Sequence, residues 1–577
     1  MKSIRVQILL WQFIAIVYCQ SDGLKVKTIV GEVIGVKQKT FVNQLVYISY
    51  KGIPYAEPPV GKLRFGVPVP VKPWSKPLVT TNEYQNSCLV LGQSVLLGMK
   101  TNKSEDCLYL NVYTPVTDES KTNKKLPVLF WIHGGAYLEG DGSDLYQGAD
   151  FLMEHNVVFV SINYRLGPFG FANFDTAGYT GNMGLKDQRL ALKWVKENIA
   201  SFGGDAESIT VIGESAGGAS VHFQLMSDAC QYVNRAVMMS GSAFNYWSYY
   251  KENNNVNVLK EAFKEELGDK TSPEDILNFM RDAPVDVIVA KTPAFDLSAT
   301  SLVFFWTPVV EDKKKAVEPI LTQRPHEIYA QNKFSAHCKS VDVVLTTTSA
   351  EFMSFNNPFS PYAFTQSLKT TSPYIHIPYH GLTLAPNSMK YQKVQASIKK
   401  LYFGDKEITE TPDQLNQFVQ MTSDANFVVP FYETMNLHSK VGKTFCAYFD
   451  IDLNTNVNKI VRHMEAVKGM GHFEETGYLF KINEPTYVNL YNQTLKNRKD
   501  PKNKKTIDAW NFVSKLIADF AKTGSLNKIG AIKSAQNARC VHVTNDGLRS
   551  ITQPKKKTID AWNKIKTSLK AYIVDEF

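Results

Sequence analysis

The chain has 577 residues, of which 44% are hydrophobic and 12% aromatic, so it can bury a large core and is not an intrinsically disordered protein. Its formal net charge of +9 is spread thinly, apart from a basic run at residues 496–505. No aromatic or glycine pattern accompanies that run, so we interpret it as a solvated loop and expect no nucleic-acid partner.

The first 19 residues are typical of a secretory signal peptide. A basic start (Lys2 and Arg5) precedes an apolar stretch at residues 6–18, and cleavage is expected after Cys19. A single-span anchor is the alternative, but the apolar stretch is short for a bilayer. No second apolar run of spanning length follows. We therefore expect a secreted, extracellular protein without a stable membrane anchor, in which residues 20–577 form a single domain.

Six cysteines remain after the signal peptide, which suits an oxidising compartment. Cys88 and Cys107 would close a short loop. Spacing alone does not decide how the other four pair. Those four are Cys230, Cys338, Cys446 and Cys540.

Two N-x-S/T triplets fit the same exported state. They begin at Asn102 and Asn492, and both lie in polar surroundings. We expect both asparagines to carry surface glycans.

The N-terminal part of the chain predicts a sheet. Residues 24–50 alternate apolar and polar positions, as in an antiparallel hairpin or meander at a sheet edge, and prolines make residues 52–59 irregular. Three almost wholly apolar runs predict strands that are buried on both faces, which requires helices on both sides of the sheet. These runs are residues 108–113, 127–132 and 157–162.

The rest of the chain alternates strands with helices. An amphipathic helix is predicted at residues 181–199, and irregular helical stretches at 250–335 and 378–440 resemble inserted caps. This alternation predicts an α/β fold with a doubly wound, mostly parallel central sheet and helical cap insertions. The later predicted strands lie at residues 209–212, 236–239, 341–345, 444–451 and 539–543, the last of which is expected to end the sheet.

One octapeptide, at residues 504–511, recurs at residues 556–563. A single repeated octapeptide is not a solenoid repeat, and it predicts no function by itself.

The motif with the clearest chemistry is Gly213-Glu-Ser-Ala-Gly217, between the strand at 209–212 and a predicted helix at 219–226. Glycines on either side of Ser215 allow a tight strand-to-helix turn that exposes the serine hydroxyl. The N-terminus of the helix then favours negative charge beside it. A five-residue pattern of this kind also arises by chance, but the flanking strand and helix favour a nucleophile elbow.

Together with this elbow, three other motifs resemble the carboxylesterase/cholinesterase family of α/β-hydrolases, and most of all the insect carboxylesterases. They are Ser104-Glu-Asp-Cys-Leu108, His133-Gly-Gly-Ala136 and residues 181–188. The resemblance runs from about residue 25 nearly to the C-terminus. It implies a secreted serine carboxylesterase that hydrolyses small-molecule esters through an acyl-enzyme, with no cofactor and no metal. The sequence leaves the oligomeric state and the physiological substrate open.

The resemblance implies that Ser215 is the nucleophile and His472 its base. A serine hydroxyl needs an adjacent base to accept its proton near neutral pH. His472 stands in Gly469-Met-Gly-His472, after the strand at 444–451. His463 lies in the same connection without flanking glycines and is expected to be a surface histidine.

By the same resemblance Glu351, after the strand at 341–345, is the acid that orients the histidine. The family usually has glycines where this chain has Thr346 and Phe352, so the loop is expected to be shaped differently. Asp342 and Glu311 are poorer candidates, because the first lies inside a strand and the second follows a stretch that is at the surface in relatives.

The resemblance also implies an oxyanion hole that uses the backbone N–H groups of Gly135 and Ala136, together with that of Ala216, the residue after the serine. Trp247 matches the family's acyl-pocket tryptophan, and core packing is the alternative role. The resemblance also implies two structural ion pairs, Arg64 with Glu105 and Arg165 with Asp187.

Some departures from the family's motifs narrow the range of possible functions. Residues 89–106 contain no aromatic residue, so the choline-binding tryptophan of cholinesterases is missing there. Glu214 stands where juvenile-hormone esterases usually have glutamine, and Asp269 and Phe279 stand where the family has its second disulfide. A non-catalytic adhesion or binding relative is the alternative from another class, but such proteins typically lose the serine or histidine. A lipase-like enzyme would share the chemistry and differ in substrate.

Overall fold

The computed structural model describes residues 24–573 except 82, 84, 92–101, 117–123, 251–254, 295–303, 356–376, 378, 380, 381, 386, 387, 457, 458 and 460–462. The expected signal peptide lies outside the described residues. Within them, no helix is both long enough and apolar enough to cross a membrane.

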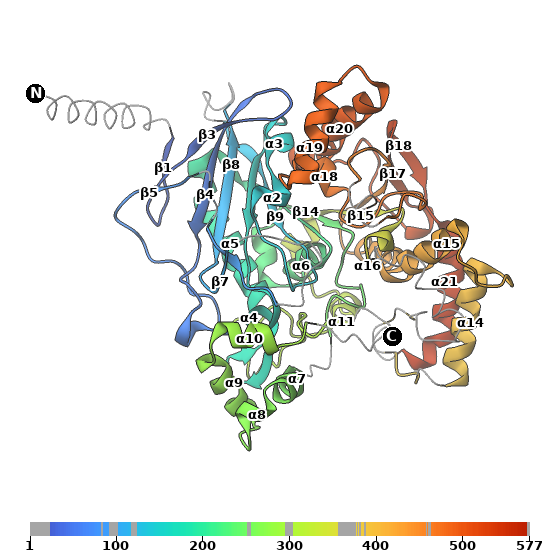
Figure 1. The fold of residues 1–577 in the computed structure, drawn as a ribbon, viewed down its shortest axis with the longest axis horizontal. Helices are drawn as coiled ribbons and strands as arrows, with labels where there is room; N and C mark the ends of the chain where they lie inside the picture. The colour runs from blue at the N-terminus through green and yellow to red at the C-terminus, as the bar shows by residue number, and fades with distance from the viewer. Residues whose placement is uncertain are drawn as a thin grey trace, which may run out of the picture.

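A mixed sheet lies at the centre of the described chain (Figure 1). The pairings from β17 across to β10 are parallel, and those at both edges are antiparallel. The predicted mostly parallel, doubly wound sheet is therefore confirmed. Its 11 strands follow the order β18 (Gly547–Thr552), β17 (Arg539–Thr544), β16 (Thr444–Asp450), β15 (Asp342–Thr348), β14 (Arg235–Met239), β13 (Gly204–Glu214), β9 (Leu126–Ile132), β10 (Val158–Ile162), β8 (Tyr109–Pro115), β4 (Val46–Pro54) and β3 (Val36–Lys39).

The prediction that residues 539–543 end the sheet is wrong, because β18 follows as an antiparallel edge strand. Asn545-Asp-Gly547 provides the hairpin turn. Arg549 and Ser550 are exposed, so β18 lacks the apolar run by which the buried strands were predicted. The predicted N-terminal meander is present as the β1–β2 and β3–β4 hairpins. The small sheets pair β1 (Lys25–Lys27), β2 (Glu32–Ile34) and β5 (Leu78–Val79), β6 (Ser87–Cys88) with β7 (Lys103–Ser104), and β11 (Asn173–Thr176) with β12 (Tyr179–Thr180).

Helices cover both faces of the sheet because its central strands are apolar on both faces. Along β9, Phe130 and Ile132 join the core that includes α5 (Met183–Asn198) and α6 (Ala216–Leu225). Leu129 and Trp131 join the opposite core, which includes α3 (Asp150–Met153), α19 (Pro485–Lys496) and α20 (Pro501–Thr523). The site described below lies where the parallel strands end.

The two predicted cap stretches are helical. The basic run at 496–505 is not a simple loop, since it spans the end of α19 and the start of α20. The other α-helices are α2 (Asp144–Gln147), α4 (Gly167–Phe171), α7 (Asn255–Ala262), α8 (Lys264–Leu267), α9 (Pro273–Asp282), α10 (Val285–Lys291), α11 (Pro325–Ala330), α12 (Ala336–Ser340), α14 (Met389–Phe403), α15 (Pro412–Ser423), α16 (Val429–His438), α18 (Thr476–Leu479) and α21 (Lys556–Leu569). Short 3-10 helices are η1 (Gly61–Leu63), η3 (Ile199–Phe202), η4 (Asp228–Tyr232), η5 (Glu351–Phe355), η7 (Ala535–Asn537) and η8 (Lys570–Tyr572), and η6 (Asp424–Val428) is a π-helical turn.

Three disulfides join the six cysteines. The Cys88–Cys107 bond is present as expected. The pairings that spacing left open are Cys230–Cys338 and Cys446–Cys540.

Candidate active site

Ser215 occupies the turn between β13 and α6 with φ 58° and ψ −124°, a conformation that is strained for a residue with a side chain. Its N–H donates to the Met239 carbonyl at 2.8 Å, which ties the turn to β14. The flanking glycines are required because backbone carbonyl groups lie too close to them for a side chain. A Cβ on Gly213 would lie 2.4 Å from the carbonyl oxygen of Gly217, and a Cβ on Gly217 would lie 2.1 Å from that of Ile132.

His472 is fixed by Glu351 at two points. Its Nδ1 lies 2.6 Å from Glu351 Oε2, and its backbone N–H donates to the Glu351 carbonyl at 3.1 Å. Both side chains are buried. The structure thus brings together the histidine and the acid that the resemblance implied.

The opposite oxygen of Glu351 accepts three hydrogen bonds. They come from the Ser240 hydroxyl at 2.6 Å, the Thr347 hydroxyl at 2.9 Å and the Thr348 N–H at 2.8 Å. Two of these donors lie at the end of β15 and the third follows β14, so the sheet itself orients the carboxylate. Glu351 begins the turn η5, in which the Phe352 N–H donates to Ser423.

The Nε2 atom of His472 faces Glu214, with a distance of 3.0 Å to Oε1. Among the described residues, no hydrogen bond joins the Ser215 hydroxyl to His472. Burial alone would lower the pKa of His472, but the carboxylates of Glu214 and Glu351 outweigh it and hold this pKa well above its ordinary value. No sequence pattern indicated a role for Glu214, although this residue directly precedes Ser215.

Glu475 is a second acidic residue that sequence analysis missed. It is fully buried, and its Oε1 lies 3.1 Å from the Ser240 hydroxyl. Burial raises the pKa of Glu475 well above its usual value, and the nearby charges of Glu214 and Glu351 add to that effect. The raised pKa favours the protonated form of Glu475. The sequence signal that could have identified Glu475 is its position in the same loop as His472, three residues further along the chain.

The expected oxyanion donors lie in strained backbone. Gly135 and Ala136 have φ of 100° and 56°. In the described part of the chain, the N–H groups of Gly135, Ala136 and Ala216 donate to no protein acceptor. A Cβ on Gly134 would lie 3.1 Å from the Ser215 Cβ, so this glycine-rich loop passes directly beside Ser215. The three N–H groups are thus available to an oxygen atom at Ser215.

Trp247 is buried, and one aromatic ring, that of Phe427, separates it from His472. Its ring lies 5.9 Å from that of Phe427, which in turn lies 4.7 Å from the ring of His472. Trp247 Nε1 donates to the Asn426 carbonyl at 3.3 Å. Asn426 and Phe427 belong to the π-helical turn η6, a local widening that often occurs at functional sites.

The alternative residues for the histidine and acid positions do not lie beside His472 and Glu351. His463 is exposed, and Asp342 pairs with Lys443 at 3.7 Å. Glu311 was expected to follow a surface stretch, but residues 308–310 are buried or half-buried in this chain. Glu311 is buried and pairs with Lys186 at 2.8 Å, both side chains being fully covered. It also accepts from Asn182 at 3.0 Å, so its role is to hold the cap segment against α5.

The expected structural ion pairs are both present. Arg64 Nε lies 2.6 Å from Glu105, and the Arg165 guanidinium binds Asp187 at 2.7 Å. The sequon asparagines Asn102 and Asn492 are both exposed.

Comparison with known proteins places this geometry in a family. A model described as the carboxylesterase family matches residues 22–573. Venom carboxylesterase-6 of Apis mellifera is 32% identical, over 76% of this chain and 76% of its own length. Esterase B1 of Culex pipiens is 29% identical, over 94% of this chain and 98% of its own length.

The fold matches a solved structure, that of juvenile hormone esterase from Manduca sexta with OTFP covalently attached. The TM-score is 0.78 at 24% identity, over 94% of this chain and 99% of that chain. At this identity the match shows the α/β-hydrolase fold alone. On the strength of the family model and the insect esterases together, the chain belongs to the carboxylesterase family and is a carboxylic ester hydrolase.

Proposed function

We propose that this protein is a secreted serine carboxylesterase in which Ser215, His472 and Glu351 form the catalytic triad. The observation that carries the proposal is the placement of His472, which is fixed at Nδ1 by Glu351 while Nε2 faces the residue that precedes Ser215. A base held in this orientation beside a strained serine turn is the arrangement that activates a hydroxyl nucleophile.

In the proposed reaction, Ser215 Oγ attacks the ester carbonyl while His472 Nε2 accepts the hydroxyl proton. His472 returns that proton to the departing alcohol, which leaves an acyl-enzyme. Water then attacks the acyl carbon with His472 again as base, and the carboxylic acid is released. Glu351 stays ionised and stabilises the imidazolium.

The oxyanion that forms in both steps would be held by the N–H groups of Gly135, Ala136 and Ala216. Because these donors have no other protein acceptor in the described structure, they need no reorganisation when the charge develops. Losing one donor of this kind typically costs on the order of 10²–10³ in kcat.

The resting position of His472 adds one requirement. Its Nε2, which lies 3.0 Å from Glu214 Oε1, must turn toward the Ser215 hydroxyl before it can act as a base. The raised pKa of His472 favours the protonated ring, which cannot accept a proton. We therefore expect the neutral ring to be the active form and activity to increase with pH.

The substrate class that we propose is uncharged esters with small acyl groups. Trp247 and Phe427 restrict the space beside His472, and residues 89–106 hold no aromatic ring for a quaternary ammonium group.

Residues 1–19 would be removed on export, leaving a single domain, and the exposed Asn102 and Asn492 would carry glycans.

Two histidine variants test the triad. His472→Ala should reduce kcat by several orders of magnitude, because triad members act as a unit. His463→Ala is the matched control, since this exposed histidine comes from the same connection, and it should leave kcat unchanged. The wild type should also release a burst of alcohol equal to the enzyme concentration if deacylation limits turnover. Reversed effects of the two substitutions would show that the base is wrongly assigned.

A further inference from the structure

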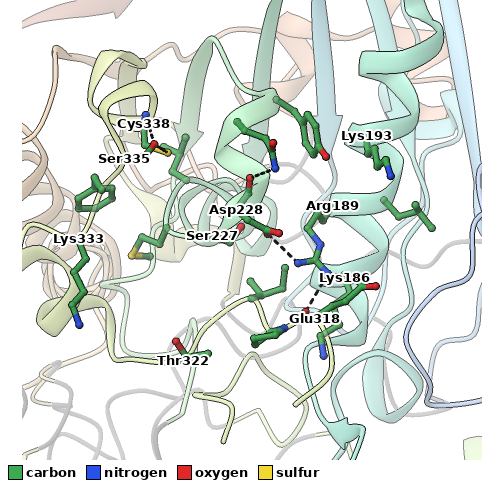
Figure 2. Close-up of a pocket in the computed structure, with 18 of the residues that line it drawn as sticks. Lys186, Arg189, Lys193, Ser227, Asp228, Glu318, Thr322, Lys333, Ser335 and Cys338 are labelled. Carbon is green, nitrogen blue, oxygen red and sulfur yellow. Dashed lines mark hydrogen bonds and ion pairs between the residues drawn. The ribbon is translucent and has the colours of Figure 1, made fainter. Parts of the chain in front are cut away.

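A cavity of about 860 Å³ lies on the protein away from the triad (Figure 2). It is formed by one face of α5, the segment 225–232 that follows α6, and the segment 318–338 between the cap and β15. The helix α6 starts beside Ser215 and ends with Leu225 in the wall of this cleft. Ten helical residues span about 15 Å, so the cleft is a separate site from the nucleophile elbow.

The floor of the cleft is apolar. Leu225, Ile320 and Phe334 line it and are almost completely buried, and Cys338 contributes its disulfide with Cys230. A volume of this size and an apolar floor are typical of sites for small organic ligands.

One wall of the cleft is a basic stripe. Lys186, Arg189 and Lys193 are spaced at i, i+3 and i+7 along α5, so they share one helix face, and all three line the cleft. They differ in their partners. Lys186 is neutralised by the buried Glu311, whereas Lys193 is 48% exposed and lies 4.0 Å from Glu197, which is 43% exposed.

Arg189 already holds carboxylates in this cleft. Its side chain is 11% exposed, and it binds Asp228 at 3.0 Å and Glu318 at 2.7 Å. Figure 2 shows these two acids approaching Arg189 from different segments of the chain. Both are more than 60% exposed (63% and 65%). Exposed ion pairs contribute little to stability, so a carboxylate from solution can replace one of them at low cost.

The residues that line the cleft include more basic than acidic side chains. Four basic residues line it (Lys186, Arg189, Lys193 and Lys333) against two acidic ones (Asp228 and Glu318). Lys186 is matched by Glu311 and Lys193 lies 4.0 Å from Glu197, so a carboxylate is bound by exchange with Asp228 or Glu318 at Arg189 and not by an excess of positive charge.

We propose that this cleft is a binding site for an amphipathic carboxylate, namely the anion of a medium- or long-chain fatty acid. The carboxylate binds Arg189 and Lys193, and the hydrocarbon chain lies on Leu225, Ile320 and Phe334. The planar guanidinium of arginine suits a carboxylate, which it can bind through two parallel hydrogen bonds. The site does not depend on the proposed triad, since it shares no residue with it.

The test measures dodecanoate binding by isothermal titration calorimetry, below its micelle concentration, on the full chain. Binding is measured on unmodified protein and on protein with the catalytic pocket filled by a covalent phosphonate. One saturable site should remain in the filled protein. Dodecyltrimethylammonium and butyrate should each bind at least tenfold more weakly, because one lacks the negative charge and the other the long chain.

Two lysine variants locate the site. Lys193→Glu should weaken dodecanoate binding at least fivefold. Lys515→Glu is the matched control, since Lys515 is also exposed and has an acidic residue four positions later, Asp519, but lies on α20. Loss of binding on phosphonate treatment, or equal affinity in the two variants, would overturn the proposal. Failure of the phosphonate to react would instead count against the proposed triad and leave the comparison of variants intact.

Discussion

Nε2 of His472 lies 3.0 Å from Oε1 of Glu214, the residue that directly precedes Ser215 in the chain. The imidazole is thus held between two carboxylates, with Glu351 at 2.6 Å from the other ring nitrogen. This arrangement stabilises the imidazolium and keeps the ring at the elbow. In the proposed mechanism, protonation of His472 would therefore set the fraction of enzyme that is active.

The pH dependence of activity tests this relationship. Since both carboxylates raise the pKa of His472, kcat/KM for a neutral ester should rise with pH through an apparent pKa above 6.5. Glu214→Gln removes one of the two charges, so the rise should move to lower pH. The measurement is a pair of pH–rate profiles. A shift to higher pH in the variant would contradict the account.

Two buried glutamates should respond differently to the same substitution. Glu351→Gln should lower kcat by about 10³–10⁴ without unfolding the protein, because it disturbs the orientation and charge of His472. Glu311→Gln should leave Lys186 without its counter-charge and destabilise the fold by about 3–5 kcal/mol, with kcat of the folded enzyme little changed. Urea unfolding together with titrated active-site concentrations separates the two effects. Full activity in Glu351→Gln would require another acid.

Trp247 should determine the acyl specificity through its contact with Phe427. We expect kcat/KM to be about tenfold higher or more for an acetyl ester of an uncharged alcohol than for acetylcholine. A tenfold ratio corresponds to roughly 1.4 kcal/mol in the activation free energy. Trp247→Leu should raise the relative rate on pivaloyl esters. The assay compares acetyl, butyryl and pivaloyl esters of one alcohol. An unchanged acyl profile in the variant would show that Trp247 only packs the core.

The Cys230–Cys338 disulfide should stabilise the fold strongly, because it closes a loop with a sequence separation of 108 residues that includes the first cap. The chain-entropy model gives about 4.7 kcal/mol for a loop of about 100 residues, against about 3 kcal/mol for a short loop such as that of Cys88 and Cys107. Replacing each pair by alanine and measuring unfolding free energies checks this order. A smaller loss for the Cys230–Cys338 pair would contradict it.

The parts of the fold that could be predicted from the sequence are those with a strong local signal. Continuous apolar runs identified β9 and β10, and the Gly-x-Ser-x-Gly motif identified the turn at Ser215. The strand β18 was missed because an exposed edge strand needs no apolar face. Glu311 was misplaced because its partner, Lys186, is 125 positions away, and only the folded chain brings the two together.

The two copies of the octapeptide have similar structural settings. Both copies lie in helices, α20 and α21, and bury their tryptophans, Trp510 and Trp562. Each copy also forms the same lysine–aspartate pair at i and i+4, at 2.7 Å in the first and 2.8 Å in the second. The same amphipathic sequence therefore serves two unrelated packing sites.

The central claim is that Ser215 is the nucleophile, and covalent labelling tests it most directly. A diethyl phosphate ester should inactivate the enzyme at one equivalent per chain. Peptide mass mapping should then find the added phosphoryl group on the peptide that contains Ser215, and Ser215→Ala should remain unlabelled. Inactivation with the label on another residue, or labelling of Ser215→Ala to the same extent, would contradict the account.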